Sequence, residues 1–279
     1  MSDHPPQTYL FVPGNRPERF AKALASGADR IILDLEDAVA PGDKAAARAA
    51  IAEWMASAGQ AQGKVLIRIN DAATDWHAQD LALARSVQAV CVMLPKCEAA
   101  AQVAAVLAEL TSSATVLPLI ETARGMLALP DIAAAPGVAR LAFGSLDYMA
   151  DLDIPADSLA LDVAASQIAI ASRAAGLASP LAGVTPALDA AKVSDDMRHA
   201  RSLGLGAKMC IHPAQVAAVR AALAPSAQEL AWAHRVLQAW QASGTGAFQL
   251  DGKMVDRPVV LKAQRIAAQA ARTDSSLIL

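Results

Sequence analysis

Short apolar segments of strand length recur along the chain, and each is followed by an alanine-rich segment of helical length. Continuous apolar runs such as Ile31-Ile32-Leu33 are typical of parallel strands that are buried on both faces of a sheet. The stretch Asp43–Ser57 predicts a helix with Asp43 at its N-cap, because Ala47, Ile51 and Met55 then share one apolar face. The eight expected strands cover residues 9–12, 30–35, 64–69, 89–94, 115–120, 140–143, 180–184 and 207–211.

Eight strands that alternate with helices over roughly 200 residues predict an α/β fold of the (β/α)8 type, a TIM barrel, which typically occupies about 250 residues. An open doubly wound sheet is the alternative. The chain lacks the glycine-rich fingerprint that follows the first strand of such a sheet. The periodicity therefore favours the barrel.

A C-terminal helical extension is expected after the eighth strand. Ser226-Ala227-Gln228-Glu229 has the pattern of a capping box, and residues 258–271 predict a last helix that opens on a proline. We predict a single domain over residues 1–279, with the barrel at about 8–222 and the helical arm at about 226–279.

Composition excludes several classes of protein. The 279 residues include 24 Lys and Arg against 27 Asp and Glu, a formal net charge of -3, whereas nucleic-acid binding normally needs a basic surplus on one face. No apolar stretch approaches the roughly 20 residues of a membrane-spanning helix, so no membrane partner is expected. The N-terminus has no signal-peptide pattern, and the three cysteines form no CxxC motif, which together predict a cytoplasmic protein with reduced thiols.

Polar residues follow most of the expected strands, where the active site of a TIM barrel lies. They are Pro13-Gly14-Asn15, Glu36-Asp37, Arg68 with Asn70, Pro95-Lys96, Glu121-Thr122, Ser145 to Asp147, Thr185 and His212-Pro213. A single glutamate after a strand is often only a helix N-cap, but here four carboxylates and one arginine would converge on one opening. The carboxylates would repel one another unless a cation or proton lay among them, and oxygen donors without His or thiolate suit Mg²⁺ or Mn²⁺.

Eight motifs occur in order from about residue 8 to residue 272. They are Phe11-Val12-Pro13-Gly14-Asn15, Leu33-Asp34-Leu35-Glu36-Asp37-Ala38-Val39, Ile67-Arg68-Ile69-Asn70, Met93-Leu94-Pro95-Lys96, Ile120-Glu121-Thr122-Ala123, Phe143-Gly144-Ser145-Leu146-Asp147-Tyr148, Ile211-His212-Pro213-Ala214-Gln215 and Gly252-Lys253-Met254-Val255-Asp256-Arg257-Pro258. Together they resemble the citrate lyase beta-subunit-like family of CoA-ester lyases, within the aldolase/citrate lyase superfamily that also contains malyl-CoA lyases.

The resemblance implies roles for the acidic and basic residues of the mouth. Glu121 and Asp147 look like the family's metal ligands, which hold Mg²⁺ (or Mn²⁺) together with water and the substrate's oxygens. Arg68 looks like the catalytic arginine that contacts the substrate's carboxylate and carbonyl oxygens. Glu36 and Asp37 match the acidic pair that lines the metal site, through water or by orienting Arg68.

Five further positions follow from the same resemblance. Phe11 lies in the first motif and is assigned to the substrate-binding surface. Asp256 matches a catalytic aspartate that, in relatives, enters the active site of the neighbouring subunit of a trimer. Arg16, Arg19 and Lys22 lie where relatives bring basic residues to the phosphates of CoA, although an exposed basic helix face is an equally good explanation.

We therefore expect a Mg²⁺-dependent carbon–carbon lyase that cleaves or forms a 3-hydroxyacyl-CoA such as citryl-CoA, malyl-CoA or citramalyl-CoA, with acetyl-CoA and a 2-oxo acid as the other side of the reaction. CoA is then part of a small-molecule substrate, and a homotrimer or a multiple of it is expected. Three alternatives stay open: a metal-dependent aldolase on free 4-hydroxy-2-oxo acids, a malyl-CoA-type thioesterase, and a subunit of a multi-chain citrate lyase. One departure from the family is Val184-Thr185-Pro186-Ala187, where relatives carry Val-Tyr-x-Asp, which leaves a substrate or pantetheine contact there open.

Overall fold

The structure is a computed structural model that describes residues 5–243 and 246–275. Its internal contacts divide the chain into two compact units, one up to Val219 and one from Arg220 onward. The two units are described separately below.

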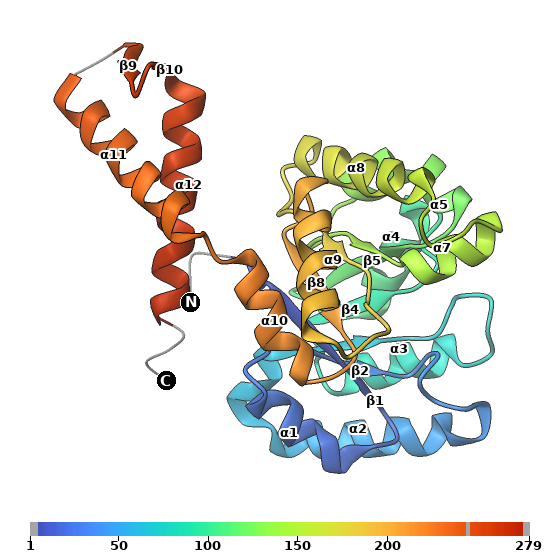
Figure 1. Cartoon of the computed structure of the whole chain (residues 1–279). Helices are drawn as coiled ribbons and strands as arrows, with labels where there is room; N and C mark the ends of the chain where they lie inside the picture. The colour runs from blue at the N-terminus through green and yellow to red at the C-terminus, as the bar shows by residue number, and fades with distance from the viewer. Residues whose placement is uncertain (1–4, 244–245, 276–279) are drawn as a thin grey trace. The chain divides into compact units, whose positions relative to one another are not determined.

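The first unit is a closed barrel of eight parallel strands surrounded by helices, as the sequence predicts (Figure 1). The strands pair in chain order, and the barrel closes where Thr8 of the first strand lies opposite Lys208 of the eighth. The strands are β1 (Thr8–Pro13), β2 (Arg30–Asp34), β3 (Val65–Arg68), β4 (Cys91–Leu94), β5 (Thr115–Ile120), β6 (Ala142–Phe143), β7 (Leu181–Ala182) and β8 (Ala207–Cys210). Strands β6 and β7 are shorter than expected. Strand β7 is limited by Pro180 before it, which has no N–H to donate, and by Gly183 after it.

At least one helix follows each strand of the barrel, and the last of these helices runs past Val219 into the second unit. They are α1 (Phe20–Ala25), α2 (Lys44–Ser57), α3 (His77–Ser86), α4 (Ala100–Glu109), α5 (Ala123–Leu127), α6 (Leu129–Ala134), α7 (Ser145–Leu152), α8 (Leu159–Ala174), α9 (Ala190–Ser202) and α10 (Ala214–Leu223), with 3-10 turns η1 (Pro17–Arg19), η2 (Pro41–Asp43) and η3 (Gly59–Lys64). Helix α2 begins directly after Asp43, but the Asp43 side chain does not cap it. That carboxylate accepts a hydrogen bond from the side-chain amide of Asn15 instead (3.1 Å), because η2 already gives Asp43 a helical backbone.

Alternation along the strands fills the barrel interior and then places polar groups at its mouth. The interior cluster includes Ile32 of β2, Leu66 of β3 and Leu119 of β5. Side chains two positions apart on a strand point to the same face, so Asp34, Arg68 and Glu121 continue these inward-facing series at the carboxyl ends of the strands. The rule that fills the core therefore also gathers these three ionisable side chains.

The second unit consists of the helices α11 (Ala227–Ser243) and α12 (Arg257–Ser275) and a hairpin of β9 (Phe248–Leu250) and β10 (Lys253–Val255) (Figure 1). The capping box of Ser226 and Glu229 is confirmed, since each residue accepts the other's backbone N–H. Residues from both helices and the hairpin share an apolar cluster that includes Val236, Val255 and Ile266. The sequence interpretation missed the hairpin, although a loop with Asp251-Gly252 is a common hairpin signal.

In the part of the chain that the structure describes, no helix combines the length and apolar character needed to span a bilayer.

Candidate functional site

The candidate site begins with Arg68, whose guanidinium is held by acidic side chains from β2 and the loop after it. Nε and Nη2 donate to the two carboxylate oxygens of Asp34 at 2.7 and 2.6 Å, a paired geometry that fixes the plane of the guanidinium. Nη1 lies 2.8 Å from Glu36 and 3.3 Å from Asp37. The ring of Phe11 lies 4.7 Å from the guanidinium carbon, so a cation–π contact completes the setting of Arg68.

The loop after β2 is itself fixed, which positions Glu36. The carboxylate of Asp34 accepts the backbone N–H groups of Glu36 (2.9 Å) and Ala38 (3.1 Å). The buried ammonium of Lys44 donates to the carbonyl oxygens of Leu35 and Glu36 at 2.8 and 3.0 Å. Asp34 therefore binds Arg68 and shapes the loop that brings Glu36 to the same guanidinium.

Glu121 lies on the other side of the mouth, at the end of β5, and is 2% exposed. Its Oε1 accepts the backbone N–H of Lys96 at 2.7 Å. Its Oε2 lies against Gly144, where a Cβ atom would be only 2.4 Å away, so this position requires glycine. Gly144 leads into α7, whose first turn carries the half-buried Asp147.

Burial and mutual repulsion shift the protonation of the two glutamates. Burial raises the pKa of Glu121 to about 8, and the negative charges of Glu36 and Asp147 add to the rise. Burial likewise raises the pKa of Glu36 to about 7, against the opposing charge of Arg68. Burial lowers the pKa of Arg68, but Asp34 and Glu36 raise it by more, so this side chain stays charged. The mouth thus holds more negative charge than its own cations balance.

Glu121 and Asp147 fit a Mg²⁺ ion by the chemistry of their donors. Within residues 5–243 and 246–275, no group of three or more His, Cys, Asp or Glu is arranged to hold a metal. Two carboxylates are nevertheless sufficient for Mg²⁺, which commonly keeps several waters and takes one or two carboxylates together with substrate oxygens. A cation bound there would also relieve the repulsion that raises the pKa of Glu121.

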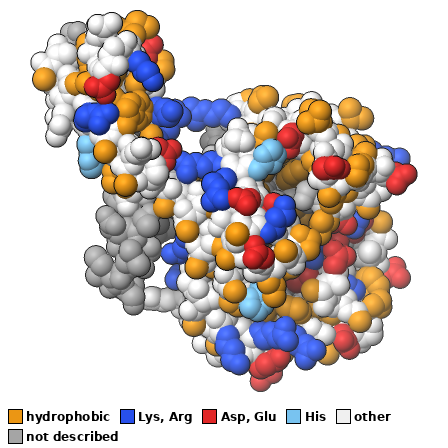
Figure 2. Space-filling view, in the orientation of Figure 1, with side chains coloured by type: hydrophobic (Ala, Val, Ile, Leu, Met, Phe, Trp, Pro, Cys, Tyr) orange, Lys and Arg blue, Asp and Glu red, His pale blue; other side chains and the backbone are white. Residues whose placement is uncertain are grey.

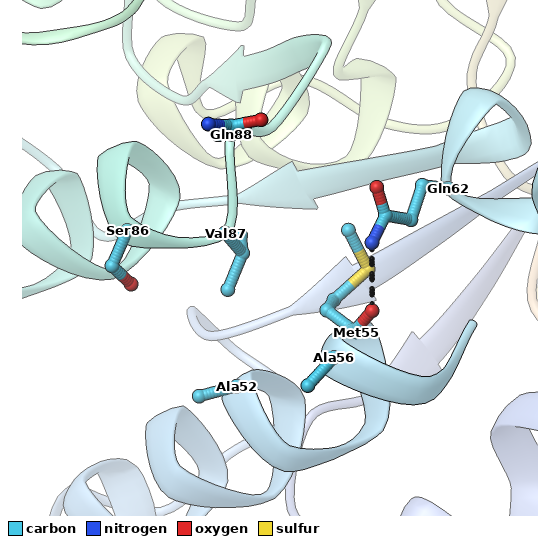
Figure 3. Close-up of a pocket in the computed structure, with 7 residues that line it drawn as sticks. All are labelled: Ala52, Met55, Ala56, Gln62, Ser86, Val87 and Gln88. Carbon is cyan, nitrogen blue, oxygen red and sulfur yellow. Dashed lines mark hydrogen bonds between the residues drawn. The ribbon is translucent and has the colours of Figure 1, made fainter. Parts of the chain in front are cut away.

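A pocket elsewhere on the barrel has a different character (Figure 3). It has a volume of about 360 Å³ between the C-terminal ends of α2 and α3 and is lined by Ala52, Met55, Ala56, Gln62, Ser86, Val87 and Gln88. None of these residues is charged, and helix ends that precede β3 and β4 lie at the end of the barrel opposite the mouth. Conserved chemistry in TIM barrels lies at the other end, so this pocket is not the candidate active site.

Comparison with known proteins agrees with the geometry of the mouth. A family model described as HpcH/HpaI aldolase/citrate lyase matches residues 7–213. The chain belongs to this family. A citrate lyase subunit beta-like protein of Mycobacterium tuberculosis is 39% identical over 274 residues, which cover 96% of each chain. A (3S)-malyl-CoA thioesterase of Cereibacter sphaeroides is 32% identical over 276 residues, which cover 96% of this chain and 95% of the relative.

A solved structure has the same fold over nearly the whole chain. The crystal structure of protein CitE from Mycobacterium tuberculosis, in complex with magnesium, acetoacetate and coenzyme A, matches with a TM-score of 0.85 and 37% identity. The match covers 95% of this chain and 98% of the solved one. The predicted resemblance to citrate lyase beta-subunit-like proteins and the predicted barrel are therefore confirmed.

The structure brings some of the predicted residues of this HpcH/HpaI family member together and leaves others apart. Phe11, Glu36, Asp37, Arg68 and Glu121 share the mouth, with Asp147 close enough to Glu121 to affect its pKa.

Arg16, Arg19 and Lys22 are exposed on the segment after β1, where Arg19 lies 3.7 Å from Glu18. Asp256 belongs to the second unit, where its Oδ1 accepts the backbone N–H of Val259 at 3.3 Å, at the start of α12.

Two residues of the site carried no role in the sequence interpretation. Asp34 has a signal that could have revealed it, because a carboxylate two positions after Ile32 in a buried strand must face the barrel interior. Lys96 stands in the expected group of strand-end residues, but its contacts depend on a backbone conformation with φ of 43°, which the sequence does not encode visibly.

Replacing Arg68 by Met should lower the free energy of unfolding by about 3–5 kcal/mol, because Asp34 and Glu36 would remain buried without their cation. Chemical denaturation measures this loss. Arg124→Met is the control, since Arg124 is 84% exposed and lies 4.0 Å from Glu98, and it should cost less than about 1 kcal/mol. Equal small losses in the two variants would contradict the central position of Arg68.

Proposed function

We propose that the chain is a Mg²⁺-dependent CoA-ester lyase, which cleaves or forms a 3-hydroxyacyl-CoA such as citryl-CoA, malyl-CoA or citramalyl-CoA. The products of cleavage are acetyl-CoA and a 2-oxo acid. The observation that carries the proposal is the pairing, at one mouth, of a fixed guanidinium (Arg68) with two carboxylates suited to a divalent cation (Glu121 and Asp147). The solved relative that binds magnesium, acetoacetate and coenzyme A supports the same substrate class.

Each residue of the site has its own role in the reaction. When bound by Glu121 and Asp147, Mg²⁺ supplies Lewis-acid polarisation of the substrate's oxygens. As the carbon–carbon bond breaks, the hydroxyl group gives its proton to solvent and becomes the carbonyl of the 2-oxo acid, and the electron pair of the broken bond moves to the thioester enolate. The fixed charge of Arg68 stabilises the oxygen on which this negative charge develops. Glu36 and Asp37 keep Arg68 oriented, and Asp256 of a neighbouring copy exchanges a proton with the enolate carbon.

Contacts to the CoA moiety are assigned to the basic residues after β1. Arg16, Arg19 and Lys22 are exposed and close together in sequence, so their side chains are free to approach the phosphates of a ligand at the surface. Phe11 forms the apolar floor under Arg68.

A thioesterase is the second candidate function, and a specific observation favours it. The relative at 32% identity is named (3S)-malyl-CoA thioesterase and is covered over 95% of its length. In such an enzyme the same site would go on to transfer the acyl group to water, which releases free CoA. The two functions therefore differ in the products that accumulate.

A panel of citryl-, malyl- and citramalyl-CoA with Mg²⁺ separates these functions. The lyase should release a 2-oxo acid and acetyl-CoA in equal amounts without free CoA. Glu121→Gln should lower kcat/KM by roughly 10²–10³-fold, because the cation that polarises the substrate's oxygens would lose one of its two carboxylate ligands. Glu109→Gln, on the exposed side of α4, should leave it unchanged. Free CoA without a matching 2-oxo acid would establish the thioesterase instead.

Magnesium affinity should rise with pH, because a cation must displace the proton that Glu121 keeps up to a pKa of about 8. Calorimetry between pH 6 and 8 should show a gain of up to about tenfold per pH unit that levels off above pH 8. The ordinary pKa of a glutamate carboxyl is 4.5, so the folded protein binds the Glu121 proton more tightly than the unfolded chain does. Without metal, the free energy of unfolding should therefore fall as pH rises from about 4.5 through about 8. A pH-independent affinity would contradict the assignment of Glu121 as a ligand.

Assembly into a homotrimer is proposed from complementary surfaces. An apolar groove of about 570 Å³ lies among α5, α6 and α8, and its lining includes Leu127 and Ile170, which are 87% and 68% exposed. Figure 2 shows hydrophobic and acidic side chains on the molecular surface. Residues 145–172, on and beside this groove, contain five Asp and neither Lys nor Arg, whereas residues 220–279 contain seven Lys and Arg against four Asp and Glu. We assign the groove to the basic second unit of another copy.

Mixing two inactive variants tests this assembly. Glu121→Gln and Asp256→Asn should each be inactive alone, because each lacks one component of every site. After exchange of subunits in an equal mixture, about a quarter of the sites should regain both components. Light scattering should give the mass of a trimer. No recovery of activity after verified exchange would mean that Asp256 does not act across subunits.

A further inference from the structure

Lys96 has an unusual backbone for a lysine. It follows β4 by two residues and has φ of 43°, in the left-handed region that residues with a Cβ atom seldom occupy. Such a conformation has an energetic cost and persists only where the surrounding structure imposes it. Lys96 stands second in the turn Pro95-Lys96, where proline favours the first position and the second position takes the left-handed conformation.

The other non-glycine left-handed residues of the described chain, like Lys96 itself, lie in turns. Gln88, with φ of 52°, lies at the opposite end of β4 and its N–H donates to the carbonyl of Arg85, which closes the end of α3. Asp153 is the left-handed C-cap of α7, a common way to end a helix. Asp251 lies in the β9–β10 turn. At each of these three positions, the left-handed conformation lets the chain turn or ends a helix.

What distinguishes Lys96 is that its backbone N–H donates to a side chain 25 residues away. It reaches Oε1 of Glu121 at 2.7 Å, while the ammonium of Lys96 lies 3.3 Å from Oε1 of Glu36. One residue thus contacts both buried glutamates of the mouth, which repel each other. Because Oε1 of Glu121 is engaged, the oxygen that faces Gly144 and α7 is Oε2.

We propose that Lys96 is a positioning residue for the metal site: its left-handed backbone holds Oε1 of Glu121 so that Oε2 faces the side of Asp147. The inference rests on the proposed function, since it assigns the strain at Lys96 to the orientation of a metal ligand. Groups that orient a metal ligand typically change metal affinity by about 10–100-fold when they are removed.

Variants at this position separate the effect of the backbone conformation on magnesium affinity from the effect of the ammonium charge. Lys96→Gly, Lys96→Ala and Lys96→Val all remove the charge, but they differ in their tolerance of positive φ, from free in Gly to poor in the β-branched Val. Magnesium dissociation constants are measured by calorimetry at pH 8 on the folded full-length proteins. We expect Lys96→Gly to bind within about threefold of the parent and Lys96→Val to bind at least about tenfold more weakly, with Ala between them.

Gln88, in the turn that precedes β4, supplies the matched control. At both positions the Val variant should melt at a lower temperature than the Gly variant, because Val tolerates positive φ poorly. At Gln88, however, neither substitution should change the magnesium dissociation constant. If Lys96→Val does not fold, the Gly and Ala variants carry the comparison. Equal magnesium affinity in all folded Lys96 variants would overturn the inference and leave the proposed function standing. No magnesium binding by the parent protein would overturn both.

Discussion

Arg68 is surrounded by carboxylates that would not otherwise stay together in a buried mouth. Asp34 binds it through two hydrogen bonds, Glu36 and Asp37 approach its third nitrogen, and Phe11 lies beneath it. Taking these charges out of water is costly, and a buried pair is tolerated only when its geometry and hydrogen bonds are nearly complete. The paired contact with Asp34 meets this condition, and Glu36 gains its place through the loop that Asp34 also fixes.

The proposed chemistry of the mouth depends on two carboxylates outside this cluster, those of Glu121 and Asp147. Among the described residues, Arg68 forms ion pairs with Asp34, Glu36 and Asp37 but not with Glu121 or Asp147. Burial raises the pKa of Glu121 to about 8. A group held partly protonated near neutral pH is poised either to exchange a proton or to take a cation. Membership of the HpcH/HpaI aldolase/citrate lyase family, together with a relative solved with magnesium, favours the cation. The same barrel geometry that packs Ile32, Leu66 and Leu119 also positions Glu121, one of the two proposed ligands of that cation.

Much of this arrangement could be predicted from sequence, because it depends on strand ends alone. Parallel strands of a barrel finish at one edge, so Glu36, Arg68 and Glu121 had to approach one another once eight strands were recognised. The left-handed backbone of Lys96 belongs to a local turn after Pro95, but the contact of its N–H with Glu121 could not be predicted, because the two residues are far apart in the chain. Asp43 takes the N-cap position of α2, as predicted, but its side chain makes no capping hydrogen bond, because the preceding 3-10 turn already gives this residue a helical backbone.

The second unit shows a different limit. Its hairpin and helices form their own apolar cluster, and local signals such as the Ser226–Glu229 capping box describe them well. The proposed role of Asp256, in contrast, depends on another copy of the chain, which no periodicity within one sequence reveals.

The proposed chemistry requires a divalent cation between β5 and α7. Crystals grown with Mn²⁺ and a 2-oxo acid, measured at a wavelength where Mn²⁺ scatters anomalously, test this directly. We predict one anomalous peak at the mouth, bound by one oxygen each of Glu121 and Asp147, with the 2-oxo acid between the ion and Arg68. A peak bound by Glu36 and Asp37 without Glu121, or no peak at the mouth at saturating Mn²⁺, would contradict it.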